Sequence, residues 1–246
     1  MVLIASPPSP GTPRVANERD ILTRFQHSTT HLRPLIEEIQ EPAEPPIIIL
    51  KHLDDHLLNS SVKKALNREE LKYVARCILE ALSVLHEEGY VHTDVKLDNI
   101  FLGDLGGCYT ADSEFARSVI METPWNTATD IWSFGAVPDI LGGLKSSRPR
   151  AIPYGHEEYN LEVLKQQFRY FGPFPAKYGE IASPETATAI LYLMHEIPQS
   201  QTTPFSRTTQ REVSLKDKEF ISGMMKLDWR DRPTAQQLLE SKWFED

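Results

Sequence analysis

The sequence is poor in several kinds of residue, and each shortage excludes a class of protein. Two of its 246 residues are cysteines, and Cys77 and Cys108 form neither a metal-ligand spacing nor a disulfide framework. No apolar run approaches the roughly 20 residues that a membrane-spanning helix needs, and the run Met1–Ala5 is too short for a signal peptide. We therefore expect an intracellular protein, cytoplasmic or nuclear, without a membrane partner.

Positive charge is also scarce in this chain. Lysine and arginine number 26 against 35 aspartates and glutamates, which gives a formal net charge of -9. This excess of acid disfavours nucleic acid as the main partner, and a bound polyphosphate would need metal ions and local cations. The hydrophobic content of 40% is ordinary for a globular protein, and the length allows one large or two small domains.

The first hundred residues contain the few segments that predict strands. Residues 1–16 are rich in proline and serine and are expected to form a flexible arm. Asn17 is expected to cap a helix that runs through Phe25. The β-branched run Ile47–Leu50 predicts a buried strand.

The rest of the chain is predicted to be mostly helical. Asn67 and Glu70 form a capping-box pattern that opens an amphipathic helix, and Gly89 is expected to end it. Residues 142–156 are expected to form a loop. Further helices are predicted at 127–141, 157–171, 215–226 and 233–240.

The short polar loop after the long helix carries the strongest chemical signal, because it places Asp94, Lys96 and Asn99 close together. Phosphoryl transfer needs an acceptor for the proton of the attacking hydroxyl, positive charge on the γ-phosphate and ligands for magnesium. Asp94 can orient the hydroxyl and Lys96 can neutralise the transferring group. Asn99 can offer a neutral oxygen to a hard cation. Small-molecule phosphotransferases share a similar Asp and Asn pair, so this loop alone leaves the class of enzyme open.

This loop resembles the catalytic loop of eukaryotic Ser/Thr protein kinases, H-R-D-x-K-x-x-N, with Thr93 in place of the arginine. Three further segments resemble the same family in the same order. These are Asn17–Leu22, like the regulatory helix with Glu18 as its ion-pairing glutamate, Asp130–Gly135, like the start of the central helix, and Asp231–Ala235, like the terminal helix region. The Phe168–Ala176 stretch also resembles an insert of the cyclin-dependent, MAP and SR-protein kinase group, although plain packing is the alternative.

The resemblance implies an α+β, protein-kinase-like fold with an incomplete N-lobe. It places a remnant of the N-lobe and the hinge at 17–53 and a mostly helical C-lobe at 54–246. It also implies ATP and Mg²⁺ as cofactors, and a protein as substrate or partner.

The same resemblance assigns roles to individual residues. Asp94 is similar to the catalytic base, Lys96 to the phosphate-contacting lysine and Asn99 to one magnesium ligand. Asp104 resembles the aspartate of the D-F-G metal motif, with a plain glycine-rich turn as the alternative.

The resemblance also places an adenine site at the hinge. For Leu50 and Phe101, plain core packing is the alternative role. Phe101 resembles the residue that packs beneath the base. The hinge itself is expected at Leu50, Lys51, His52 and Leu53.

An apolar column that crosses both lobes is also implied. It would contain Leu22, Leu35, His92 and Leu105, with His92 close to Asp130.

Several features that this family uses to grip ATP are missing. No G-x-G-x-x-G motif occurs, and no lysine precedes Lys51 to pair with Glu18, so Glu18 is expected to be a solvated helix charge. Only five positions separate Asn99 from Asp104, which is too short for the β-ribbon that the family places between its two metal ligands.

Two further departures fall in the expected C-lobe. Arg232 lacks the glutamate that it would pair with, because no A-P-E motif lies between Asp104 and Trp125; Glu122 is an unsupported substitute. Pro138 falls inside the expected central helix, where an interior proline costs roughly 3 kcal/mol or more.

Three functions remain open from the sequence. The chain is a Ser/Thr kinase, a non-catalytic pseudokinase that acts as a scaffold, or a small-molecule phosphotransferase. The segments at Asp130 and Asp231 disfavour the small-molecule phosphotransferase. The missing phosphate-binding lysine and glycine-rich loop favour the pseudokinase over the active enzyme.

Overall fold

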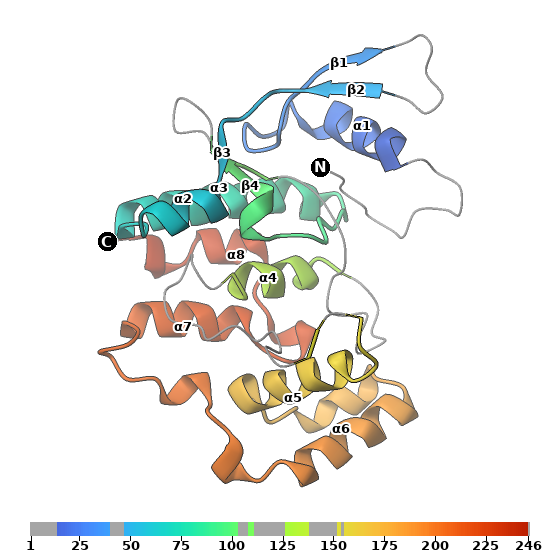
Figure 1. Ribbon diagram of the computed structural model, residues 1–246, viewed down its shortest axis with the longest axis vertical. Coiled ribbons are helices and arrows are strands. Elements are labelled where there is room, and N and C mark those ends of the chain that lie inside the picture. Colours follow the sequence, from blue (N-terminus) through green and yellow to red (C-terminus); the bar gives the residue numbers. More distant parts are fainter. Residues whose placement is uncertain are drawn as a thin grey trace.

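The computed structural model describes residues 14–39, 47–102, 108–110, 126–137, 152–153 and 155–245. A small layer of one helix and two strands lies above a larger helical part (Figure 1). The strands are β1 (Leu35–Ile39), β2 (Ile47–Leu50), β3 (Asp55–His56), β4 (Ile100–Leu102) and β5 (Cys108–Thr110). The α-helices are α1 (Arg14–Phe25), α2 (Leu57–Lys63), α3 (Arg68–Glu87), α4 (Ala128–Gly135), α5 (Tyr159–Phe171), α6 (Pro184–Glu196), α7 (Leu215–Met224) and α8 (Ala235–Leu239). Short 3₁₀-helices occur at Leu97–Asn99, Ala176–Glu180, Gln199–Gln201, Phe205–Arg207, Trp229–Asp231 and Lys242–Phe244.

The small layer consists of α1 packed beneath an antiparallel pair of strands, β1 and β2, whose register runs from Leu35 opposite Leu50 to Ile39 opposite Ile47. The prediction of a helix and few strands here is confirmed. The predicted helix start at Asn17 is wrong, because α1 begins at Arg14, most of a turn inside the expected arm, where Arg14 and Ala16 are strong helix formers.

The prediction that β2 is a buried strand is also wrong. Ile47 and Ile49 point to the same side of β2 and are 46% and 41% exposed. Within the described residues the sheet has two strands, and its other face meets α1. One side of each strand therefore stays open to solvent.

Helix α3 is the central element of the molecule, and its predicted ends are confirmed. Asn67 accepts a hydrogen bond from the Glu70 N–H at 2.9 Å, and the Glu70 carboxylate accepts one from the Asn67 N–H at 2.9 Å. The helix ends before Gly89, whose φ of +77° favours glycine.

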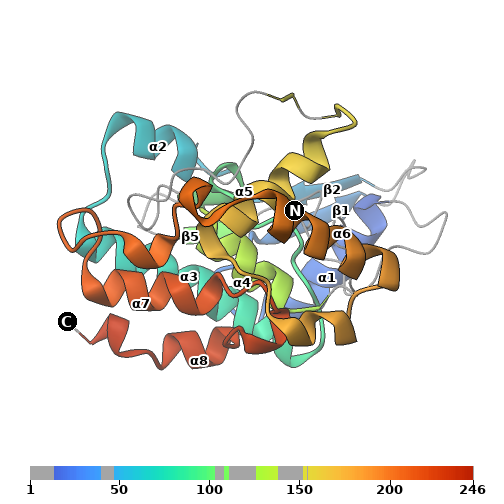
Figure 2. The same cartoon turned by 90° about the horizontal axis from the view of Figure 1, so that it is seen from below.

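Two hydrophobic cores meet on α3. The smaller one gathers Leu22 and Phe25 of α1 with Ala81 and Leu85 of α3. The larger one contains the other apolar face of α3 together with α4, α7 and α8, which lie side by side in the view from below (Figure 2). The small layer is thus attached to the C-lobe through a helix that belongs to both cores.

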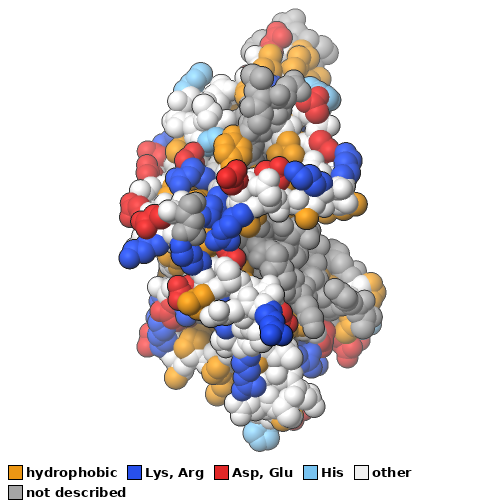
Figure 3. Space-filling view, turned by 90° about the vertical axis from the view of Figure 1, so that its left-hand side faces the viewer, with side chains coloured by type: hydrophobic (Ala, Val, Ile, Leu, Met, Phe, Trp, Pro, Cys, Tyr) orange, Lys and Arg blue, Asp and Glu red, His pale blue; other side chains and the backbone are white. Residues whose placement is uncertain are grey.

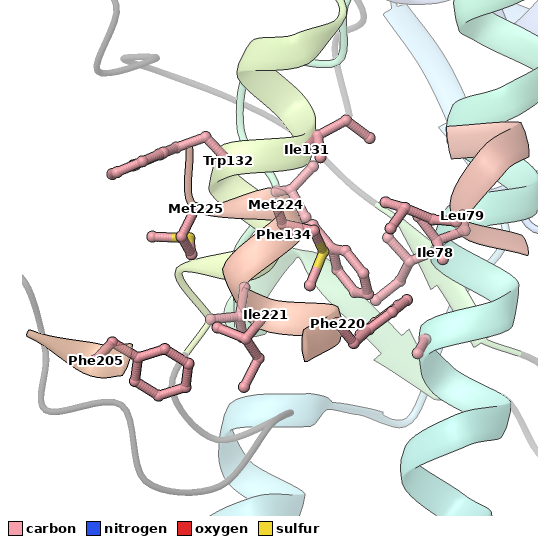
Figure 4. Close-up of a cluster of buried hydrophobic side chains, with 14 of the residues drawn as sticks. Ile78, Leu79, Ile131, Trp132, Phe134, Phe205, Phe220, Ile221, Met224 and Met225 are labelled. Atoms are coloured by element: carbon pink, nitrogen blue, oxygen red, sulfur yellow. The ribbon is translucent and has the colours of Figure 1, made fainter. Parts of the chain in front are cut away.

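The larger core is built on close contact between α4 and α7. Phe134 is fully buried, and Figure 4 shows it among Ile78 of α3 and Met224 of α7. A Cβ atom added to Gly135 would come within 2.8 Å of the Met225 Sδ. The added atom would also lie 3.0 Å from the Met224 Cβ, so the glycine of the Asp130–Gly135 segment favours this close approach.

Helix α4 ends at Gly135, well short of the predicted helix at 127–141. Pro138 and residues 142–151 of the loop predicted at 142–156 lie outside the described residues. As described, α4 stops three positions before Pro138, so this proline does not lie in the interior of α4.

The face formed by α2 and the start of α3 carries lysines and arginines beside acidic side chains (Figure 3). Lys63 lies 2.8 Å from Asp55, and Lys64 lies 2.8 Å from Glu70. Arg68 pairs with Asp217 of α7 at 3.0 Å. The first pair joins α2 to β3, the other two join α3 to its neighbours, and each exposed pair adds at most about 1 kcal/mol.

The capping box gives a direct test of the start of α3. Asn67→Ala removes the acceptor for the Glu70 N–H, so we expect it to lower the free energy of unfolding by about 1 kcal/mol in urea titrations. Asn67→Asp keeps an acceptor oxygen and should remain within about 0.5 kcal/mol of the parent chain. Equal losses in both variants would show that the cap does not stabilise the helix.

Candidate active site

The catalytic-loop residues come together as the sequence predicts. The Lys96 Nζ lies 2.7 Å from the Asp94 Oδ2, and the Asn99 amide donates to the same oxygen. The Asn99 Nδ2 also donates to the Asp94 main-chain oxygen at 3.2 Å. One buried carboxylate, one ammonium group and one amide thus form a compact group immediately after α3.

The buried carboxylate of Asp130 holds the backbone of this loop. Its Oδ2 accepts a hydrogen bond from the His92 N–H at 2.7 Å, and its Oδ1 accepts one from the Thr93 N–H at 2.7 Å. Asp130 has no solvent exposure, and α4 positions it. Two short hydrogen bonds, donated by the backbone to one carboxylate, therefore fix the loop just before Asp94.

Thr93 has a strained backbone, with φ at 70°. For a β-branched residue this conformation is an outlier that costs on the order of 1–3 kcal/mol. The hydrogen bond to Asp130 offsets this cost. The strain turns the chain sharply between His92 and Asp94.

His92 and His86 surround the same carboxylate. The His86 Nε2 lies 2.9 Å from the Asp130 Oδ2, a contact that the sequence analysis missed because nothing in the loop motif points back into α3. Complete burial lowers the pKa of His92 to about 4, against the attraction of Asp130. The imidazole is therefore neutral at pH 7, and its Nδ1 accepts a 3.3 Å bond from the Asp94 N–H.

Part of the predicted column of apolar side chains can be followed in the structure. Leu22 belongs to the smaller core, Leu35 packs against that core, and His92 is fully buried beside Asp130. That these side chains form one column stays a prediction. The predicted closeness of His92 and Asp130 is confirmed, whereas Leu105 lies outside the described residues.

The hinge residues follow β2 and differ in exposure. Leu53 is buried and Leu50 packs against the smaller core, while Lys51 and His52 are exposed. Phe101 packs partly against the same core and meets the ring of His56 edge-on, with centroids 6.3 Å apart. The hinge and the expected floor of the base site are thus joined through one core.

A residue that the sequence analysis did not consider also reaches the hinge. Arg33 precedes β1, and its Nε donates to the Lys51 main-chain oxygen at 2.8 Å. The centre of its guanidinium lies 5.4 Å from the centroid of the Phe101 ring. No sequence motif marks Arg33, because only the folded β1–β2 pair brings it beside the hinge.

The expectation that no complete β-ribbon fits between Asn99 and Asp104 is confirmed, because the ribbon that follows Asn99 is completed only by a strand that begins at Cys108. Strands β4 and β5 pair antiparallel, with Ile100 opposite Thr110 and Leu102 opposite Cys108. Asp104 itself lies outside the described residues, but its place in the chain is between the two strands. The ribbon therefore encloses Asp104 instead of preceding it.

Two further expectations about charged residues are corrected. Glu18 is buried at 9% exposure, so it is not a solvated helix charge. Arg232 has partners other than a glutamate, because it donates to three main-chain oxygens and lies 4.8 Å above the Trp132 ring. Burial lowers the pKa of its guanidinium to about 10, which still leaves it charged at pH 7. Glu122 lies outside the described residues.

Two general properties complete the description of the molecule. None of the helices that the structure describes is long and apolar enough to cross a membrane. In the same part of the chain, no three His, Cys, Asp or Glu side chains gather into a group that could hold a metal ion.

Several curated relatives resemble the chain over much of its length. A calcium/calmodulin-dependent protein kinase type 1 from Macrobrachium nipponense is 26% identical over 92% of this chain and 61% of its own length. A serine/threonine-protein kinase US3 homolog from Cercopithecine herpesvirus 9 is 26% identical over 70% of this chain and 56% of its own. The human serine/threonine-protein kinase PAK 4 is 29% identical over 78% of this chain and 30% of its own. The chain thus spans at most about 60% of the length of these relatives.

A family profile covers almost the whole chain. It describes the protein kinase domain and matches residues 8–244, which include the catalytic loop, the Asp130–Gly135 segment and the Asp231–Ala235 segment. With the geometry around Asp94 and Asp130, this match shows that the chain belongs to the protein kinase domain family.

Proposed function

We propose that this chain transfers the γ-phosphoryl group of ATP to serine or threonine hydroxyls of protein substrates. The observation that carries the proposal is the group formed by Asp94, Lys96 and Asn99, in a loop whose backbone Asp130 anchors just before Asp94. The names of the relatives support a Ser/Thr kinase over the pseudokinase alternative.

In this proposal, Asp94 accepts a hydrogen bond from the substrate hydroxyl and takes its proton as the oxygen attacks the γ-phosphorus. The bond between the γ-phosphorus and the bridging oxygen breaks, and ADP leaves with that bonding electron pair. Lys96 lies close enough to Asp94 to offset the negative charge of the transferring group. Because positioning contributes most of the acceleration in phosphoryl transfer, the rigid support from Asp130 is essential.

We propose that Asn99 supplies one ligand to a divalent cation, Mg²⁺. With the Asn99 Nδ2 donating to Asp94, the carbonyl oxygen of the same amide is turned to the other side, and hard cations prefer such oxygens. A bound cation would neutralise charge on the phosphates.

We propose that the second metal ligand is Asp112, in place of Asp104. The family arrangement puts a β-ribbon between the two ligands, and the pairing of β4 with β5 supports a ribbon that ends at Thr110. Asp112 is the first acidic residue after that ribbon. Asp104 would then belong to the connection between the strands.

We place the adenine at the hinge, between Leu50–Leu53 and Phe101, as the resemblance implies. Leu50 and Phe101 share one small core, which supports a single rigid site. No lysine precedes Lys51 and no glycine-rich loop is present in the sequence, so we expect ATP affinity and turnover to be low.

The narrower resemblance to the cyclin-dependent, MAP and SR-protein kinase group remains a prediction. It rests on Phe168–Ala176, where Phe168 and Phe174 are buried and Phe171 meets Trp132 edge-on at 5.5 Å. These contacts support the packing alternative for that stretch. None of the three relatives named above carries a name from that group.

Replacing Asp94 tests the proposed reaction. We expect Asp94→Asn to lower phosphate transfer from radiolabelled ATP to a basic protein substrate by about 100-fold or more, because a general base contributes about that factor. Asp98→Asn is the matched control, since Asp98 is half-exposed in the same loop and lies 3.9 Å from Lys96. If both variants matched the parent rate, the observed transfer would not come from this site.

A second pair of variants tests the metal ligand. We expect Asp112→Asn to raise the Mg²⁺ concentration needed for half-maximal transfer at least tenfold, because a ligand is lost. Asp104→Asn should leave the Mg²⁺ requirement unchanged. The reverse result would restore Asp104 as the ligand.

A further inference from the structure

The hinge carbonyl that a base would use is already engaged by a side chain of this protein. The Lys51 N–H donates to the Pro34 main-chain oxygen at 2.9 Å, and the Lys51 oxygen accepts from the Arg33 Nε at 2.8 Å. Both main-chain polar groups of Lys51 are thus bonded to the segment that leads into β1.

The same guanidinium also covers Phe101. At 5.4 Å from its carbon to the ring centroid, it lies within the range of a cation–π contact. Arg33 therefore contacts the hinge carbonyl and the aromatic ring at once. A guanidinium is flat and carries N–H donors, as does the amine edge of adenine, so the two groups suit the same acceptor and the same ring face.

We propose that Arg33 occupies the base site and competes with adenine for it, so that nucleotide binds only when this side chain moves away. This inference rests on the adenine site proposed above. It adds an internal competitor at the hinge end of that site.

The backbone around Arg33 allows the side chain to move without disturbing the fold. Leu32 is buried in the smaller core, and Pro34 has a fixed φ and accepts the Lys51 hydrogen bond. Arg33 itself is only half-buried, so its guanidinium can leave towards solvent while its main chain stays in place. A guanidinium stays protonated at all ordinary pH values, so a competing ligand, and not a pH change, would displace it.

The expected loss of adenine affinity depends on the fraction of molecules in which the Arg33 side chain has left the base site. If Arg33 fills the site at least nine-tenths of the time, the apparent dissociation constant of a base is raised at least tenfold. Removing the side chain should remove that factor.

The test is calorimetric titration of the full chain with adenosine, which carries the base without phosphates, and then with ATP and Mg²⁺. We expect Arg33→Val to bind adenosine at least tenfold more tightly than the parent chain. Arg33→Lys, which keeps the charge but loses the planar fork, should bind more tightly than the parent and less tightly than Arg33→Val. Thermal melting of each variant checks that it is folded.

Arg24→Val is the matched control. Arg24 also lies over an aromatic ring, 5.4 Å from the centroid of Tyr90, and pairs with Glu88 away from the hinge. It should bind adenosine like the parent.

The outcomes separate this inference from the proposed function. Equal or weaker adenosine binding by Arg33→Val than by the parent would overturn the role of Arg33, and the kinase proposal would stand if transfer still depended on Asp94. Absence of adenosine and ATP binding in every variant would contradict both the competitor and the nucleotide site.

Discussion

The geometry of the site depends on one buried carboxylate. Asp130 has no exposure to solvent, and two main-chain N–H groups and one imidazole contact its carboxyl oxygens. Burying a carboxyl group is costly unless hydrogen bonds compensate it, so these partners and Asp130 require one another. As a result, the start of α4 and the loop after α3 hold a fixed relation, and Asp94 takes its position from that relation.

This dependence explains why Thr93 tolerates an unfavourable backbone conformation. A loop held only by its own local preferences would relax to a negative φ. Here the N–H bond to Asp130 and the buried neighbour His92 determine the path of the chain. Phe134 and Met224 pack in the larger core and hold α4 in place. Because Asp130 lies on α4, this packing also helps to hold the strained turn next to Asp94.

Local signals in the sequence predicted much of the fold. The Asn67 capping box and Gly89 set the ends of α3, because these residues act through hydrogen bonds and φ preferences within a few positions. The spacing of Asp94, Lys96 and Asn99 predicted their closeness for the same reason: all three lie in one short loop.

Predictions that depended on distant partners were the ones that failed or fell short. The exposure of Ile49 follows from how many strands join the sheet, which its own residues do not record. The partners of Arg232 are main-chain oxygens, and these carry no sequence signature. The β4–β5 pairing was missed because Asp104 was taken as the end of the ribbon, although the connection between the strands passes through it.

Because α3 belongs to both cores, the two parts of the molecule are expected to differ in how readily they unfold locally. The smaller core has few buried side chains, while the larger one takes in most of α3, α4 and α7. Regions with less buried apolar contact open at lower free energy, as separate cooperative units. Amide hydrogens of α1 and the β1–β2 pair should therefore exchange with solvent before those around Ile78 of α3. Such an opening would free the hinge from Arg33 and Pro34 while the catalytic loop keeps its anchor on Asp130.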